Sequence, residues 1–312
     1  MRAVVIPSFG GPEVLTVVDL PMPVAEPGEV LVKVAASTVN PTDLNLRAGT
    51  QAALLKGLAP PYIAGMEFSG TVHTLGAGAR GFTPGQPVMG IVNTRRARGG
   101  SQAEYVAVPA ASLVPVPSGH DLIEAATVPM NGLTAYLSLE MLALPRGSSL
   151  LVTGGPGALG GYVIQLARHA GLRVVADGKD SDHALLRQLG ADLLVPRGPE
   201  MSAAVRTLFP SGVDGALDGA SLNDVSAALV KEGGSFVSVR RSAVVTDQRV
   251  RHHYVGVLDR ATDTAALQWL ADRWREGVLT TRVARRLPCT AAAEANRLVA
   301  GGGMRGRVVL TF

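Results

Sequence analysis

The sequence has one cysteine, no long apolar run and no strong charge imbalance, and these features exclude several classes of protein. Among its 312 residues, Cys289 is the sole cysteine, which excludes an intrachain disulfide and a zinc site with two cysteine ligands. No apolar stretch reaches about 18 residues, so we expect no membrane contact. The 29 basic and 25 acidic side chains leave a net charge of +4, a mild excess that says little about nucleic acid, and no nucleic-acid partner is expected. We therefore expect a cytoplasmic protein.

The composition is that of a globular chain with two domains. Hydrophobic residues make up 47% and charged residues 17% of the sequence. At about 150 residues per domain, the length predicts two domains.

The first half of the chain is rich in short β-type runs interrupted by proline and glycine. No segment before residue 119 shows a long helical period. This pattern predicts a compact, mostly antiparallel β-domain. The predicted strands are Ala3–Ile6, Val14–Val18, Val30–Val34, Phe68–Leu75, Gln86–Val92 and Glu104–Val108.

From about residue 122 onward, short apolar strands alternate with helical patterns. Such alternation predicts a parallel, doubly wound sheet. The predicted strands are Ser149–Thr153, Arg173–Ala176, Leu193–Val195, Gly215–Leu217 and Phe236–Val239. The helices predicted between them are Gly160–Ala170, Ala184–Leu189, Met201–Leu208 and Asn223–Lys231, followed later by Thr264–Glu276 and Ala292–Ala300.

A glycine-rich turn follows the strand Ser149–Thr153 and leads into a helix. Gly154, Gly157 and Gly160 have the spacing G-x-x-G-x-x-G. Glycines at such a turn let a pyrophosphate approach the backbone, and the N–H groups of the new helix then face the phosphates. An ordinary glycine-rich turn is the alternative, but the strand–turn–helix context favours a dinucleotide site. The residues predicted to contact the cofactor here are Thr153, Gly154, Gly155, Gly157, Ala158, Leu159 and Gly160.

Two charged residues after the next strand bear on the choice of cofactor. Asp177 lies where a carboxylate accepts hydrogen bonds from the adenosine ribose and favours NAD(H). Lys179 lies two residues further on and could pair with a 2′-phosphate, which favours NADP(H). The residues themselves leave this choice open.

Ordered motifs run along almost the whole chain. They are Phe9–Leu15, Gly28–Val34, Val39–Asp43, Gly65–Gly70, Leu133–Tyr136, Gly190–Asp192 and Gly306–Leu310. In these motifs the chain resembles the zinc-free quinone oxidoreductase (zeta-crystallin-like) branch of the medium-chain dehydrogenase/reductase superfamily. The resemblance implies a GroES-like β-domain formed by residues 1–119 and 260–312, and a Rossmann domain formed by residues 120–259.

The same resemblance implies a reductase that transfers hydride from NAD(P)H, most often NADPH, to a quinone or an activated C=C bond. We therefore favour NADP(H) over NAD(H), with a small-molecule substrate and a homodimer. The resemblance places Asn40 and Thr134 near the nicotinamide, and it adds Gly219, Val239 and Arg240 to the expected cofactor contacts. Arg241, next to Arg240, could contact the cofactor or an anionic substrate group, or lie in a solvated turn.

The positions of the zinc ligands in zinc-dependent relatives carry other residue types in this chain. They are occupied by Asn40, Met66 and approximately Asn131, none of which supplies a thiolate or imidazole. We therefore expect no metal, and reduction of a substrate already polarised by conjugation.

The chain departs from the family at the tyrosine that many relatives carry shortly after the aspartate of the Val39–Asp43 motif. Asn45 takes its place, and the next tyrosine is Tyr62. The proton is therefore expected from water or from Tyr62.

Two other functions stay open at this point. An enoyl-thioester reductase of a biosynthetic pathway would need a basic rim, which Arg95, Arg96 and Arg98 could supply. A non-enzymatic NADPH- or RNA-binding protein is permitted by the same arginines and by Arg285-Arg286.

Overall fold

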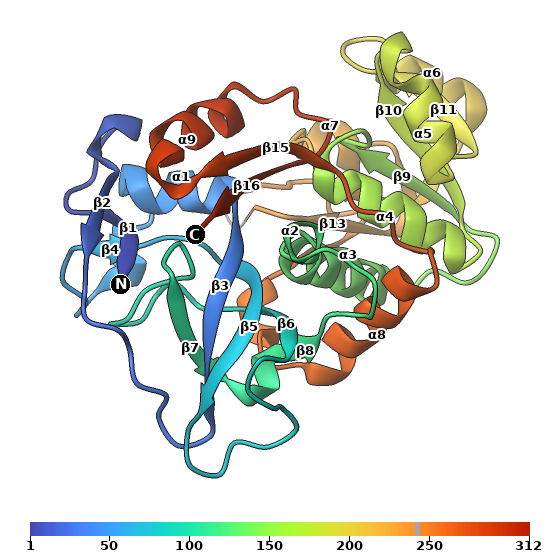
Figure 1. Ribbon diagram of the computed structural model, residues 1–312. Helices are drawn as coiled ribbons and strands as arrows, with labels where there is room; N and C mark the ends of the chain where they lie inside the picture. The colour runs from blue at the N-terminus through green and yellow to red at the C-terminus, as the bar shows by residue number, and fades with distance from the viewer. Residues whose placement is uncertain (241–243) are drawn as a thin grey trace. The chain divides into compact units, whose positions relative to one another are not determined.

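The computed structural model describes residues 1–240 and 244–312, which form two compact units (Figure 1). Unit 1 consists of Met1–Met130, Leu258–Arg275 and Thr281–Phe312. Unit 2 consists of Asn131–Val257 and Glu276–Thr280. The domain boundaries expected from the sequence, at residues 119 and 260, stay predictions.

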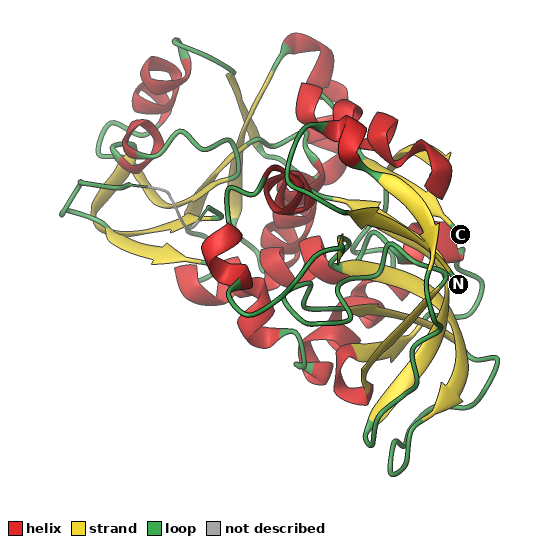
Figure 2. Ribbon diagram, turned by 90° about the vertical axis from the view of Figure 1, so that its left-hand side faces the viewer, coloured by secondary structure: helices red, strands yellow, loops and turns green. Residues whose placement is uncertain are grey.

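Unit 1 is built on a mostly antiparallel seven-stranded sheet around the long strand β3. Its path is β15-β16-β3-β5-β6-β8, and β7 also pairs with β3. A second sheet has the order β2-β1-β4. Loops rather than helices join most of these strands (Figure 2). The strands are β1 (Arg2–Ile6), β2 (Thr16–Asp19), β3 (Glu29–Val39), β4 (Tyr62–Ile63), β5 (Glu67–Leu75), β6 (Pro87–Ile91), β7 (Tyr105–Pro109), β8 (Leu113–Pro115), β15 (Val283–Pro288) and β16 (Arg307–Thr311).

The helices of unit 1 are few and mostly short. They are α1 (Pro41–Ala48), α2 (Leu122–Ala125), α8 (Thr264–Arg275) and α9 (Ala292–Gly301). Helix α1 has eight residues, too few to give a long helical period, and Gly49, with φ of 74°, is its C-cap. Helix α9 packs against α1 and β16.

Unit 2 is a six-stranded parallel sheet with helices between its strands. The strand order β11-β10-β9-β12-β13-β14 is that of a doubly wound sheet. The chain starts at the central strand β9, adds β10 and β11 on one side, and then returns to add β12, β13 and β14 on the other side. Every residue of β9 is buried, as expected for the central strand of a sheet covered on both faces. The predicted α/β class, with a β-rich domain and a doubly wound domain, is confirmed.

The bounds of the remaining elements show one wrong prediction. The helix predicted over Asn223–Lys231 ends at Ala227, because Val230 pairs with Val213 and starts a strand. The strands are β9 (Ser149–Thr153), β10 (Arg173–Gly178), β11 (Leu193–Pro196), β12 (Val213–Asp218), β13 (Val230–Ser238) and β14 (Arg251–Tyr254). The helices are α3 (Pro129–Leu142), α4 (Ala158–His169), α5 (His183–Leu189), α6 (Met201–Leu208) and α7 (Asp224–Ala227). Short 3-10 turns are η1 (Pro12–Val14), η2 (Ala52–Leu55), η3 (Ala110–Ser112), η4 (Asp180–Asp182), η5 (Val257–Arg260) and η6 (Cys289–Ala291).

Among the described residues, no helix combines the length and the apolar character that crossing a membrane requires.

Candidate functional site

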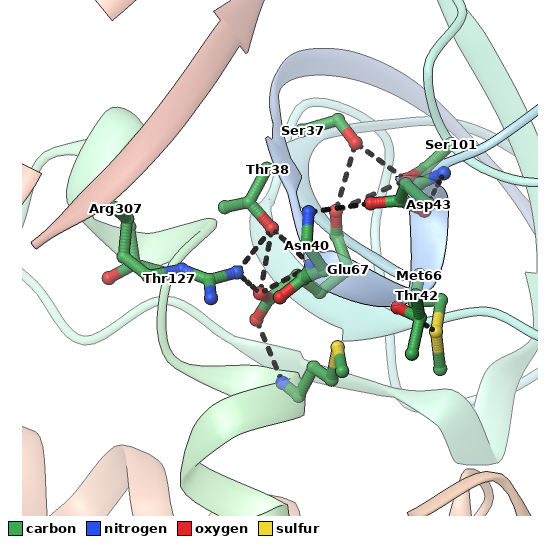
Figure 3. Close-up of polar contacts among 12 residues, drawn as sticks. Ser37, Thr38, Asn40, Thr42, Asp43, Met66, Glu67, Ser101, Thr127 and Arg307 are labelled. Carbon is green, nitrogen blue, oxygen red and sulfur yellow. Dashed lines mark hydrogen bonds and ion pairs between the residues drawn. The ribbon is translucent and has the colours of Figure 1, made fainter. Parts of the chain in front are cut away.

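Unit 1 contains a buried polar cluster around Glu67 that includes the predicted site residue Asn40 (Figure 3). Oε1 of Glu67 accepts from Thr38 Oγ1 at 2.7 Å, from Asn40 Nδ2 at 3.4 Å and from Arg307 Nη2. Oε2 accepts from the backbone N of Met130 at 2.8 Å. The carboxylate is therefore held from several elements at once.

Strand register places these side chains together. In the antiparallel pairing of β3 with β5, Ser37 lies opposite Phe68, so Thr38 lies next to Glu67. In the pairing of β16 with β3, Val308 lies opposite Val39, so Arg307 lies at the level of Asn40.

Asn40 is the N-cap of α1, and Asp43 fixes the backbone of Asn40. The N–H of Asn40 donates to Oδ2 of Asp43 at 2.8 Å, and the N–H of Gly65 donates to Oδ1 at 2.9 Å. The side chain of Asn40 is turned so that Nδ2 donates to Thr38 Oγ1 at 3.0 Å. Within the described chain, Oδ1 of Asn40 is buried and has no hydrogen-bond partner. Such an acceptor costs free energy until a donor reaches it.

Burial changes the acidity of both carboxyl groups. Desolvation raises the pKa of Asp43 to about 6, although the two backbone N–H donors and Arg307 act in the opposite direction. Desolvation also raises the pKa of Glu67, while the Arg307 guanidinium and the donors Thr38 and Met130 favour its charged form.

Two of the three positions at which the sequence predicts the loss of a zinc ligand lie in unit 1. At one of them, Met66 accepts a hydrogen bond through its sulfur from Thr42 Oγ1 at 3.2 Å, and at the other Asn40 contacts Thr38 and Glu67. The third, Asn131, is buried in unit 2. Within residues 1–240 and 244–312, no group of three His, Cys, Asp or Glu side chains is arranged to hold a metal ion.

The predicted proton donor Tyr62 makes contacts outside the Glu67 cluster. Its ring stacks on Phe9 with centroids 5.5 Å apart, and its hydroxyl donates to the carbonyl oxygen of Leu58 at 3.3 Å.

In unit 2, the glycine turn has the tightly folded backbone that the sequence predicts. Gly157 is the N-cap of α4, and its carbonyl accepts the first helical bond from Gly161. A Cβ on Gly160 would lie 2.3 Å from the carbonyl oxygen of Gly154, and one on Gly157 would lie 3.0 Å from that oxygen. Ala158 and Leu159 open the helix, where backbone N–H groups have no intrahelical acceptor.

Thr153 and Gly219 support this turn from the ends of two neighbouring strands. Thr153 Oγ1 donates to Asp218 Oδ1 at 2.7 Å, and the N–H of Gly219 donates to the carbonyl oxygen of Thr153 at 3.2 Å. A Cβ on Gly219 would lie 2.6 Å from that same carbonyl oxygen.

The two charged residues predicted to select the cofactor have different surroundings. Asp177 is buried in β10 and pairs with Arg197, with its Oδ1 also accepting from the N–H of Gly155 at 3.1 Å. Lys179 is exposed just after β10.

The remaining predicted residues lie in unit 2. Thr134 is buried in α3, and its carbonyl accepts from Ser138 Oγ at 2.7 Å. Val239 is half-buried and Arg240 exposed after the end of β13. Arg241 lies outside the described residues.

The arginines considered as a basic rim have three different sets of partners. Arg95 donates to Gln51 at 3.3 Å, and Arg96 donates to the carbonyl oxygens of Gly99 and Ala107. Arg98 pairs with Glu29 at 2.7 Å.

Glu67, Arg307 and Arg197 are not among the site residues predicted from the sequence. Glu67 and Arg307 lie in motifs that mark the family, which was a usable signal. The chain gives no local signal for Arg197, because its partner Asp177 lies on the neighbouring strand.

Comparison with known proteins agrees with this architecture. Residues 26–118 match the model of the alcohol dehydrogenase GroES-like domain, and residues 189–310 match that of the zinc-binding dehydrogenases. The chain belongs to the medium-chain dehydrogenase/reductase family. Its β-rich domain is thus GroES-like, as predicted.

Relatives within this family include named reductases. The 2-methylene-furan-3-one reductase of Solanum lycopersicum is 32% identical over 244 residues, which are 76% of this chain and 61% of that protein. The NADPH-dependent alkenal/one oxidoreductase, chloroplastic, of Arabidopsis thaliana is 31% identical over 246 residues, 77% of this chain and 62% of that protein. The chain thus spans about three fifths of the length of both. The quinone oxidoreductase of Coxiella burnetii is 28% identical, with a TM-score of 0.90 over 100% of this chain and 99% of that one.

Proposed function

We propose that this protein is an NAD(P)H-dependent reductase that transfers hydride to a quinone or to the activated C=C bond of an enone or alkenal, without zinc. The observation that carries the proposal is the glycine turn between β9 and α4, whose backbone is packed too closely for a Cβ at Gly160. The family membership and the named reductases among its relatives support the same activity.

The residues of unit 2 fit the nucleotide part of the cofactor. Gly157, Ala158 and Leu159 present a helix N-terminus, where N–H groups and the helix dipole favour phosphate. Gly154, Gly155 and Gly160 let the turn pack closely on its neighbours, since a Cβ at each would lie 3.1 Å or less from another protein atom. Thr153 and Gly219 hold the turn. Val239 and Arg240, after β13, are proposed to lie nearer the nicotinamide end.

Asn40 and Thr134 are proposed as the polar residues at the nicotinamide. The buried Oδ1 of Asn40 fits an amide N–H donor such as the carboxamide of the ring. When bound, the cofactor supplies the hydride that reduces the electron-poor carbon of the substrate. The protein's share is to hold the two reactants in place and to offer donors to the oxygen on which negative charge develops.

The absence of a zinc requirement is proposed from the residue types. An amide at Asn40, a thioether at Met66 and an amide at Asn131 are not the thiolate, imidazole or carboxylate ligands that catalytic zinc uses. A substrate already polarised by conjugation does not need a Lewis acid.

Water and Tyr62 are the two proposed proton sources. The Tyr62 hydroxyl already donates to Leu58, so it must leave that bond to protonate a substrate. A loss of about a hundredfold in turnover for Tyr62→Phe would assign the proton to the tyrosine, and unchanged turnover would assign it to water.

We also propose that the protein is a homodimer in the cytoplasm.

The proposed function is tested by oxidation of NADPH and NADH against quinones, enones and enoyl thioesters. We expect rapid oxidation with a quinone or an enone. A rate confined to enoyl thioesters would assign the carrier-linked alternative instead. Cofactor binding with no oxidation by any acceptor would favour a non-enzymatic nucleotide-binding protein.

A further inference from the structure

An ion pair lies at the carboxyl end of β10, where a doubly wound fold places the adenosine ribose of a dinucleotide. Arg197 Nε donates to Asp177 Oδ2 at 2.8 Å, and Arg197 Nη2 is 3.4 Å from Oδ1. The pair follows from strand register. Gly178 lies opposite Pro196 in the parallel pairing of β10 with β11, and the N–H of Arg197 donates to the carbonyl oxygen of Gly178 at 3.0 Å.

These contacts change what Asp177 can do. Its side chain is 2% exposed, and its oxygens accept from the guanidinium and from the N–H of Gly155 in the glycine turn. An acid that selects NAD(H) needs a free oxygen for the ribose hydroxyls and a negative charge that repels a 2′-phosphate. In this chain the charge is balanced by Arg197 and the oxygens are engaged inside the protein.

Arg197 itself remains accessible. Its side chain is 34% exposed, and no partner of its guanidinium other than Asp177 lies among the described residues. A guanidinium can bind a carboxylate on one edge and a phosphate on another, because its five N–H groups lie in one plane.

Lys179 is less suited to the same task. Two acids follow it closely, the fully exposed Asp180 and the buried Asp182, whose Oδ2 accepts from the N–H of Lys179 at 3.1 Å. These carboxylates offset the lysine charge where a phosphate would approach.

We propose that Arg197 determines cofactor choice by neutralising Asp177 and by binding the 2′-phosphate of NADP(H). This inference rests on the proposed function, since it assigns a residue to the nucleotide of the same reductase. It gives Asp177 a role other than selecting NAD(H), and it places the proposed phosphate contact at Arg197 rather than at Lys179.

The test measures dissociation constants for NADPH, NADH, 2′,5′-ADP and ADP by fluorescence and calorimetry. The proteins are the wild type, Arg197→Ala, Arg197→Lys, Lys179→Ala and Asp177→Asn. The ADP pair reports on the adenosine phosphate without the nicotinamide or any turnover. Arg197→Ala leaves the buried carboxylate of Asp177 unpaired, so thermal unfolding is measured for each variant to show that it is folded. The double variant Asp177→Asn/Arg197→Ala removes the arginine without leaving an unpaired buried charge.

We expect the wild type to prefer NADPH and 2′,5′-ADP. Arg197→Ala and the double variant should weaken both by about tenfold or more while leaving NADH and ADP within about twofold. Arg197→Lys should keep part of the preference, Lys179→Ala nearly all of it, and Asp177→Asn should leave NADH binding unchanged.

The inference is overturned if the wild type prefers NADH, or if the preference survives in folded Arg197→Ala or in the folded double variant. It is also overturned if Asp177→Asn weakens NADH alone. By contrast, a wild type that binds none of the four nucleotides would contradict the proposed function itself.

Discussion

Glu67 and Arg307 are 240 positions apart in the chain and form an ion pair inside unit 1. They lie on β5 and β16, which pair with opposite edges of β3. Both side chains also contact Thr38, so the pair links three strands beside Asn40.

Removing one partner of this pair should destabilise the protein strongly. Arg307→Met leaves the buried carboxylate of Glu67 without its counter-charge, and we expect a loss of about 3–5 kcal/mol in the free energy of unfolding. The matched control is Arg168→Met, which breaks an exposed pair with Asp192 and should cost less than about 1 kcal/mol. Urea unfolding measures both, and equal losses would contradict the structural role given to Glu67 and Arg307.

Asp43 should make stability depend on pH in an unusual direction. Burial raises the pKa of Asp43 from 3.8 to about 6, so the folded protein binds this proton more tightly than the unfolded chain. The stabilisation is therefore complete below about pH 4 and is lost as the pH rises through about 6. The unfolding free energy of the wild type minus that of Asp43→Asn should fall by about 3 kcal/mol over this window.

Asp224 provides the control of opposite sign for this pH dependence. Hydrogen bonds from the backbone and side chain of Thr246 lower the pKa of Asp224, so its contribution is lost as the pH falls. The difference between wild type and Asp224→Asn should therefore rise with pH. If the difference in unfolding free energy between wild type and Asp43→Asn also rises with pH, the pKa of Asp43 in the folded protein lies below that in the unfolded chain. That result would contradict the raised pKa of Asp43.

Substitutions in the glycine turn should separate binding from folding. Gly157 has an extended backbone with φ of −67°, and its Cβ would lie 3.0 Å from the Gly154 carbonyl oxygen, so Gly157→Val should fold with a modest loss of stability. It should lose NADPH affinity by about tenfold or more, because its side chain blocks the pyrophosphate. Gly160→Ala should lower stability by about 1–3 kcal/mol, since its Cβ meets the Gly154 carbonyl. Gly301→Ala, with open space around it, is the control. Calorimetry showing unchanged NADPH affinity in folded Gly157→Val would place the dinucleotide elsewhere.

Chelation should leave the activity unchanged. Asn40, Met66 and Asn131 offer no thiolate or imidazole, so we expect no stoichiometric zinc by elemental analysis and full NADPH oxidation after treatment with a chelator. One tightly bound zinc per chain, with activity lost on its removal, would contradict the zinc-free mechanism.

Elements with a strong local pattern were predictable from the sequence. The strand Ser149–Thr153 has the predicted bounds because it is a short apolar run ended by glycines. The helix Met201–Leu208 also has them, since Met201 and Val205 bury one face at helical spacing.

Elements that depend on a distant partner were not predictable. The strand Arg251–Tyr254 is polar and largely exposed, and its pairing with β13 makes it a strand. Side-chain contacts that depend on a distant partner were not predictable either. The glycine turn could be located from spacing, whereas the pairs Glu67–Arg307 and Asp177–Arg197 require the registers of β5, β16 and β11 with their neighbours.

Transfer of deuteride from C4-deuterated NADPH to an enone in a single turnover tests the central claim most directly. The reductase account predicts loss of NADPH absorbance together with one deuterium on the carbon β to the carbonyl, detected by mass spectrometry. Asn40→Ala should slow this step and Gly301→Ala should not. NADPH that binds at the glycine turn but transfers no deuterium to an enone, and is oxidised by no quinone or enoyl thioester, would contradict the account.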